Sequence, residues 1–193
     1  MKNQDLFKEL ENYYLPGPLK TKDRKVTEEL VKEGVFVEKD FTWGTTPYKT
    51  FCDLVNCIEE KKKRFVVFGS SAGFMCFYWN NLYPEIPTVG LDIHPARVEF
   101  AQGLVEKYNV KNVEFKLESA FDFKLNGTDL LWQNNLCFES QVADAFTAKI
   151  VEQNPEIAII SYRPISAERK YVKREYLPVS WMEKQPFFIY EKV

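Results

Sequence analysis

Two short segments, about twenty residues apart, hold residue types suited to binding a nucleoside. Gly69-Ser70-Ser71-Ala72-Gly73 follows the apolar run 65–68, and Asp92 lies near the end of the apolar run 88–93. Small residues let the backbone approach a ligand closely, and a helix that follows such a turn presents unpaired N–H groups. A carboxylate at the end of the next strand can accept hydrogen bonds from both hydroxyls of a ribose. The two segments therefore predict a site for a ribose-containing cofactor.

The spacing of the glycines separates two candidate cofactors. A dinucleotide site uses G-x-G-x-x-G to hold a pyrophosphate, whereas this turn reads G-x-x-x-G. The pattern therefore favours S-adenosylmethionine over a nicotinamide cofactor. The residues expected to bind it are Gly69, Ser70, Gly73, Asp92 and Ile93. The alternative is that the glycines only form a tight turn and that the acid only caps the following helix.

Alternating apolar runs and helical segments predict the fold that positions these residues. Strands are expected at 65–68, 88–93, 113–117, 129–133 and 157–161, with helices between them. Strands that alternate with helices form a parallel sheet with right-handed crossovers, and ligands bind at the carboxyl ends of its strands. The end of the chain departs from this alternation, because 176–182 and 186–193 read as two strands of an antiparallel hairpin. We predict an α/β, Rossmann-like, seven-stranded methyltransferase sheet of five parallel strands plus this hairpin, with helices on both faces.

The first sixty residues predict a small helical extension and a loop that covers the cofactor, ahead of a methyltransferase domain at 61–193. Helices are expected at 4–14, from an N-cap at Thr27, and at 49–60, and Ser140 is the expected N-cap of a later helix. The basic run 61–64 has two readings. It is either a nuclear-targeting or phosphate-contacting patch, or the C-terminus of a helix whose dipole the cations complement.

Composition excludes several other classes of protein. The net charge is −2, which gives no field for binding nucleic acid or membrane, and no apolar run approaches the ~20 residues of a membrane span. His94 is the one histidine, and the four cysteines form no C-x-x-C pair, so neither a metal site nor a Ser–His–Asp enzyme is expected. We expect a nuclear or cytoplasmic protein whose thiols are reduced.

Three segments resemble one particular family of methyltransferases. They are Trp-Gln-Asn-Asn-Leu-Cys-Phe at 132–138, Val-Ser-Trp at 179–181, and the stretch 45–55 ahead of the cofactor turn. Together they resemble the non-SET histone-lysine methyltransferases, the disruptor-of-telomeric-silencing family, over roughly residues 43–193. That family carries Asn-Asn-Phe-Ala-Phe after the fourth strand, Val-Ser-Trp before the last hairpin, and Gly-Glu-Thr-Ser-Phe-Asp-Leu-Val ahead of the cofactor turn.

The resemblance implies an acceptor site for a protein lysine, with a histone or a nucleosome as the partner. Asn134 would lie beside the transferred methyl group and orient the acceptor. Phe138 and Trp181 would line the lysine channel, and so would Tyr190 or, in an alternative register, Ile189. The rings could instead be plain core residues, and the asparagine could be a strand-end cap.

The resemblance also adds cofactor contacts. Thr50 would lie beside the cofactor, Phe121 would pack against its adenine, and Ser119 or Ala120 occupies the place of a third-strand acid. The segment 67–74 departs from the family, with valine where the first strand normally ends in an acid, serine for the middle glycine, and phenylalanine for a polar residue. Two alternatives therefore stand beside a lysine methyltransferase: a methyltransferase for another acceptor, and a methyltransferase-shaped binding protein without activity.

Overall fold

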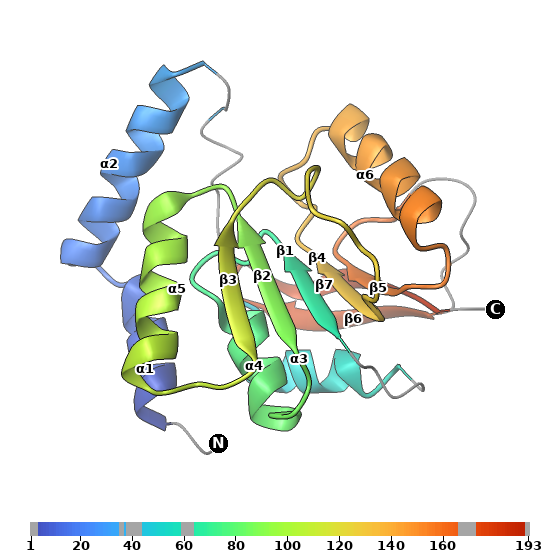
Figure 1. Cartoon of the computed structure of the whole chain (residues 1–193), viewed down its shortest axis with the longest axis horizontal. Coiled ribbons are helices and arrows are strands. Elements are labelled where there is room, and N and C mark those ends of the chain that lie inside the picture. Colours follow the sequence, from blue (N-terminus) through green and yellow to red (C-terminus); the bar gives the residue numbers. More distant parts are fainter. Residues whose placement is uncertain (1–3, 35–36, 38–43, 59–63, 166–172, 192–193) are drawn as a thin grey trace.

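The computed structural model describes the chain except for residues 1–3, 35–36, 38–43, 59–63, 166–172 and 192–193. The basic run 61–64 thus lies largely outside the described residues. The described residues form one seven-stranded sheet in the order β3-β2-β1-β4-β5-β7-β6 (Figure 1). Strand order reverses between β1 and β4, which lie next to each other at the middle of the sheet.

Five strands run parallel, as the alternation of the sequence predicts. They are β1 (Phe65–Phe68), β2 (Thr88–Asp92), β3 (Val113–Leu117), β4 (Leu130–Gln133) and β5 (Ala158–Ser161). All residues of β1, β2, β4 and β5 are buried, as expected for parallel strands covered on both faces. The predicted five-stranded parallel part of the Rossmann-like sheet is confirmed.

Helices cover both faces of the sheet. The helices α3 (Tyr48–Val55), α4 (Phe74–Leu82) and α5 (Pro95–Lys107) pack on one face, with the side chains of Val67 and Trp132. The helix α6 (Ser140–Gln153) packs on the other face. Ser140 is the first residue of α6 rather than its cap, which is Glu139 in an extended conformation. No helix among the described residues has the length and apolar character to cross a bilayer.

The N-terminal helices α1 (Gln4–Tyr13) and α2 (Pro18–Lys32) lie beside α5 at the β3 side of the sheet (Figure 1). A helix start at Thr27 was the wrong prediction, because α2 already begins at Pro18, a residue suited to the first helical position. Thr27 instead lies inside α2 and contacts His94. The buried ion pair between Asp23 and Arg97, 2.8 Å long, joins α2 to α5.

The C-terminal hairpin exists, but its turn lies earlier than predicted. The strands are β6 (Lys173–Val179) and β7 (Met182–Tyr190), so the chain turns at 180–181 rather than near Lys184. Pro186 lies inside β7, opposite Tyr176. The pairing of β7 with β5 ends at Phe188, so the missing N–H of the proline breaks no hydrogen bond to β5.

Candidate functional site

The turn after β1 keeps a backbone geometry that glycine normally supplies. Gly69, Ser71 and Gly73 all have positive φ angles, of 70°, 50° and 98°. A side chain at Gly73 would collide with the rings of Phe115 and Phe77, so this position requires glycine. Ser71 holds the left-handed conformation without being glycine, which costs about 1 kcal/mol or more. The turn therefore holds the shape of a cofactor turn although its middle glycine is absent.

Asp92, the last residue of β2, faces this turn. Its Oδ2 accepts a hydrogen bond from Ser71 N at 2.7 Å, and its Oδ1 accepts one from His94 N at 2.9 Å. A carboxylate has about four acceptor positions, so two remain for the two hydroxyls of a ribose. The side chain is buried, which keeps it in one orientation. Its placement fits the predicted role.

Tyr14 approaches the same turn from the N-terminal segment. Its hydroxyl lies 2.6 Å from the Oγ of Ser71, and its ring stacks on Phe74 with centroids 5.8 Å apart. Burial raises the pKa of Tyr14, although the hydrogen bond with Ser71 opposes this effect, so the phenol stays neutral. Sequence reasoning missed this residue, because a tyrosine at the end of a weak helical segment gives no signal of a contact 57 positions away.

Val67 of β1 and Ser70 of the turn differ in what they offer to a ligand. Val67 occupies the position of the usual acid and is fully buried in the core with Trp132. Ser70 is also buried, yet its Oγ has no hydrogen-bond partner among the described residues. An unpartnered buried hydroxyl is costly, so this group is available to a ligand at the turn. Ser70, the bent glycine backbone and Asp92 thus fit S-adenosylmethionine, whereas Val67 contributes no polar contact.

Asn134 and Asn135 form hydrogen bonds that connect the ends of β1, β4 and β5. The Nδ2 of Asn134 donates to Gly69 O at 2.5 Å, and its Oδ1 accepts from the indole of Trp132 at 3.1 Å. The Oδ1 of Asn135 accepts from the backbone N–H groups of Tyr162 and Arg163, beyond β5. Asn134 therefore contacts the cofactor turn and links the end of β4 to the end of β1, and its predicted place beside the methyl group stays a prediction.

Trp181 lies at the turn between β6 and β7, next to the end of β5. Its ring is 5.8 Å from that of Tyr162, its Nε1 donates to Gln185, and 41% of the residue is exposed. Gly44 lies directly against it, because a Cβ there would be 2.0 Å from the indole ring. Tyr162 also contacts Trp132, the neighbour of Asn134, with ring centroids 6.0 Å apart. We call these contacting rings the aromatic wall; Trp132 and Tyr162 are buried, and Trp181 is the exposed member of the three.

The loop that precedes α3 is hydrogen-bonded to Tyr162 of the aromatic wall and to Ser180 beside Trp181. Thr45 exchanges two hydrogen bonds with Ser180, and Thr46 Oγ1 lies 2.6 Å from the hydroxyl of Tyr162. Thr50 donates from its hydroxyl to Pro178 O at 2.8 Å and is buried. The structure thus gives Thr50 the role of fixing α3 to the hairpin, and its predicted contact with the cofactor stays a prediction.

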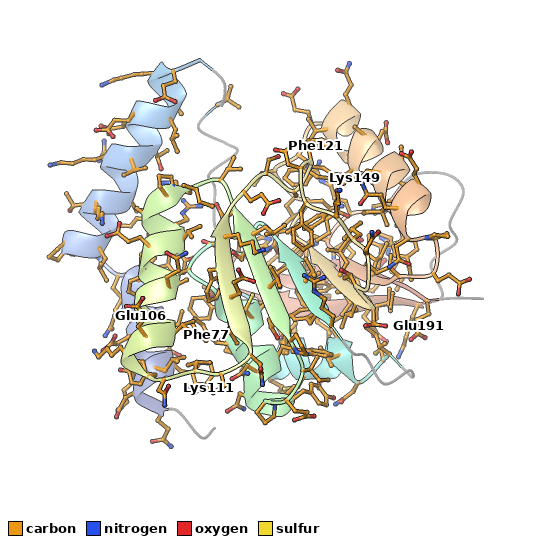
Figure 2. All side chains as sticks on the ribbon, in the orientation of Figure 1. Phe77, Glu106, Lys111, Phe121, Lys149 and Glu191 are labelled. Carbon is orange, nitrogen blue, oxygen red and sulfur yellow. The ribbon has the colours of Figure 1, made fainter. Side chains whose placement is uncertain are left out.

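Phe121 and Phe138 lie together on the face covered by α6. Both rings stack on Phe146, with centroids 3.8 Å and 5.1 Å away. Lys149 donates to the carbonyl oxygens of Ala120 and Phe121, and Figure 2 shows Phe121 and Lys149 side by side at α6. Phe121 is 44% exposed, so it presents a ring surface to a ligand. Its predicted contact with the adenine stays a prediction.

Other predicted residues are placed differently. Phe138 packs on the α6 face, whereas Trp181 packs with Tyr162 on the opposite face, so one channel lined by both is not what the structure presents. Tyr190 is fully buried, pairs with Ile159 inside β5, and accepts a hydrogen bond from Ile165 N, which makes it a core residue.

The remaining predicted residues lie near the cofactor turn or in the core. Ile189, the alternative to Tyr190, is fully buried on the face of α3 and α4. Ile93 follows Asp92 directly and is half-buried. Ser119 accepts a hydrogen bond from Phe121 N, so it shapes the loop that carries this ring. Within the described ranges, no cluster of three or more His, Cys, Asp or Glu side chains could hold a metal ion.

Comparison with known families decides the class of this site. Residues 59–164, more than half of the 193-residue chain, match the methyltransferase domain family. The chain belongs to this family. It is therefore a methyltransferase, and its cofactor is S-adenosylmethionine. No curated protein sequence matches the chain.

Solved structures share the fold at low sequence identity. An RNA methyltransferase from Salinibacter ruber, in complex with S-adenosyl-L-homocysteine, is 16% identical with a TM-score of 0.62, over 77% of this chain and 95% of that one. TrmN from Thermus thermophilus is 13% identical with a TM-score of 0.61, over 76% of this chain and 49% of TrmN. MtNAS, in complex with MTA and tNA, is 14% identical with a TM-score of 0.60, over 90% of this chain and 69% of that one.

Proposed function

We propose that this methyltransferase transfers the methyl group of S-adenosylmethionine to the side-chain amine of a protein lysine, with a histone lysine as the expected acceptor. The observation that carries the proposal is the aromatic wall formed by Trp181, Tyr162 and Trp132 beside Asn134. The Asn-Asn and Val-Ser-Trp segments at 134–135 and 179–181, both placed at this edge, support the same acceptor. A histone acceptor would also place the protein in the nucleus.

Aromatic surroundings suit the chemistry of a lysine acceptor. When bound, S-adenosylmethionine supplies an electrophilic methyl carbon, and the attacking amine must be neutral. Exclusion of water beside the ring of Trp181 would disfavour the charged ammonium, while the ring face would offset part of that loss by attracting the cation. Burial raises the pKa of Tyr162 to about 12, against opposing hydrogen bonds from Thr46 and Trp132, so this phenol is neutral and does not act as a base.

Asn134 is the residue that would orient the amine. Its Oδ1 accepts one hydrogen bond from Trp132, and a second lone pair remains for an N–H of the acceptor. Its Nδ2 is fixed by Gly69 O, so the amide cannot rotate freely. Holding an acceptor in line with a reacting carbon is the main source of rate in such a transfer. This role requires no dedicated base.

Transfer of a labelled methyl group tests the proposal. Core histones, nucleosomes, total RNA and a panel of small-molecule amines are offered separately with methyl-labelled S-adenosylmethionine. We expect label on histone lysines, and loss of transfer with retained cofactor binding in Asn134→Ala. Asn80→Ala is the matched control, because the half-buried Asn80 donates to Lys111 O, which precedes β3, and not to the cofactor turn. Transfer only to RNA or small molecules would contradict the lysine acceptor, and cofactor binding without any transfer would support the inactive alternative.

A further inference from the structure

Gln133 is a fully buried residue at the end of a central strand. It is the last residue of β4 and lies opposite Phe68 of β1 and Ser161 of β5. Its exposed fraction is zero. Neither its Nε2 nor its Oε1 has a hydrogen-bond partner anywhere in the part of the chain that the structure describes. One donor group and one acceptor group are thus buried together without partners, at the carboxyl edge where the cofactor binds.

The side chain lies on the face of the sheet that α6 covers. Side chains alternate along a strand, and Trp132 belongs to the opposite face, with α3 and α4. Leu131, two positions before Gln133, belongs to the α6 face, as does Phe68. The ring of Phe68 is 5.8 Å from that of Phe146, on which the half-exposed Phe121 stacks. Gln133 therefore shares its face with the aromatic platform of Phe121 and Phe146.

A buried amide without partners is unfavourable, and leucine would fill the same space at no such cost. Thr128 is a comparable case at the opposite edge of the sheet, because it precedes β4, is buried, and has an Oγ1 without a partner among the described residues. The difference between the two lies in position. Only Gln133 is at the carboxyl edge, where the cofactor turn and Asp92 also lie.

Among the groups of S-adenosylmethionine, adenine matches a glutamine amide best. Its edge places an amino donor beside a ring-nitrogen acceptor, and a glutamine amide pairs with such an edge through two hydrogen bonds. The ribose hydroxyls suit Asp92, and the charged methionine end suits the backbone of the turn. We propose that Gln133 is a specificity-determining residue that recognises the adenine of the cofactor, with Phe121 packing on the base.

Calorimetry with two ligands and three proteins tests this inference. The ligands are S-adenosylhomocysteine and its analogue without the 6-amino group, and the proteins are wild type, Gln133→Leu and Thr128→Val. We expect wild type to bind the analogue about tenfold more weakly than S-adenosylhomocysteine, as for the loss of one hydrogen bond. Gln133→Leu binds S-adenosylhomocysteine at least tenfold more weakly and no longer distinguishes the two ligands. Thr128→Val behaves as wild type toward both.

Thermal unfolding without ligand supplies a second readout. Both variants remove a buried group without a partner, so each should raise Tm by about 2–4 °C, and only Gln133→Leu should lose affinity. Equal affinity of wild type and Gln133→Leu for S-adenosylhomocysteine would overturn the role of Gln133 while leaving the cofactor assignment intact. Failure of folded wild type to bind S-adenosylhomocysteine at all would overturn both. A Gln133→Leu protein with lowered Tm would assign the glutamine a structural role and overturn the inference.

Discussion

The hydroxyl of Tyr14 lies 2.6 Å from the Oγ of Ser71, so the N-terminal segment is bonded directly to the cofactor turn. Ser71 in turn donates its backbone N–H to Asp92. The three residues form a chain of hydrogen bonds from the turn between α1 and α2 to the end of β2. The turn between α1 and α2 is outside the matched domain at 59–164, yet its Tyr14 contacts the cofactor turn.

A double-mutant cycle tests the bond between Tyr14 and Ser71. Tyr14→Phe keeps the ring that stacks on Phe74, and Ser71→Ala keeps the Cβ. We expect each substitution to lower the free energy of unfolding by about 0.5–1.5 kcal/mol, with a coupling energy of about 1 kcal/mol, because either one removes the same hydrogen bond. Urea unfolding of the four proteins measures the cycle. Additive effects would show that the two hydroxyls do not interact.

The ion pair between Asp23 and Arg97 joins α2 to α5, and we expect it to contribute strongly to the free energy of unfolding. Burial alone would raise the pKa of Asp23, but the hydrogen bonds and charge of Arg97 outweigh this and hold that pKa below its ordinary value. Asp23→Asn leaves Arg97 buried without its counter-ion, so we expect a loss of about 3–5 kcal/mol in the free energy of unfolding.

A pair on the same helix provides the control for Asp23→Asn. Arg24 and Glu28 are 3.0 Å apart in α2 and exposed to solvent. Glu28→Gln should change the free energy of unfolding by less than about 0.5 kcal/mol, because exposed pairs contribute little. Losses of similar size in the two variants would contradict the anchoring role of Asp23.

Stability should depend on pH through His94. Burial and the nearby charge of Arg97 lower the pKa of His94 below 6.5, against the opposing charges of Asp23 and Asp92. Below pH 6.5 the unfolded chain therefore binds a proton that the folded chain does not, and the free energy of unfolding falls as the pH falls toward the folded pKa. His94 is the one histidine in the chain, so the effect is assignable.

Urea unfolding at several pH values between 5.5 and 7.5 measures this dependence in wild type and His94→Gln. The wild-type free energy of unfolding should rise with pH across the window, and that of the variant should be flatter. A rise with equal slope in the variant would assign the dependence to other groups.

Gly44 should control the position of Trp181. A methyl group at Gly44 would lie 2.0 Å from the indole, so Gly44→Ala must displace this ring. We expect methyl transfer to the acceptor to fall roughly 10–100-fold, as a displaced site residue can cause, while the affinity for S-adenosylhomocysteine is unchanged. Gly103→Ala is the control, since nothing lies within 4 Å of its Cβ position. It should leave transfer intact and stabilise α5 by about 0.5–1 kcal/mol. Unchanged transfer in Gly44→Ala would remove Trp181 from the acceptor site.

The sequence predicts the centre of the fold well and its periphery less well. The strands around β1 and the position of Asp92 at the end of β2 are predictable, because buried apolar runs alternate with helices. The turn of the hairpin was misplaced, because Pro186 is a strong turn signal locally but lies where β7 has no partner in β5. Tertiary pairing decides that position.

The candidate site, like the fold, is only partly predictable from the sequence. The proximity of Asn134 to the cofactor turn follows from parallel strands, whose carboxyl ends meet at one edge. The separation of Phe138 from Trp181 does not follow from strand order, because it depends on which face of the sheet each ring packs against. Tyr14 and the unpartnered amide of Gln133 are likewise visible only once distant segments are packed together.

The most direct measurement is the titration of S-adenosylhomocysteine into wild type, Asp92→Asn and Asp129→Asn by calorimetry. Asp129 is the matched control, because its carboxylate accepts Arg64 N at the opposite edge of the sheet. We predict that wild type and Asp129→Asn bind with similar affinity, while Asp92→Asn, folded by its circular dichroism, binds roughly 10–100-fold more weakly through loss of charged hydrogen bonds to the ribose. Equal binding by wild type and Asp92→Asn, or no binding by wild type, would contradict the cofactor site at this turn.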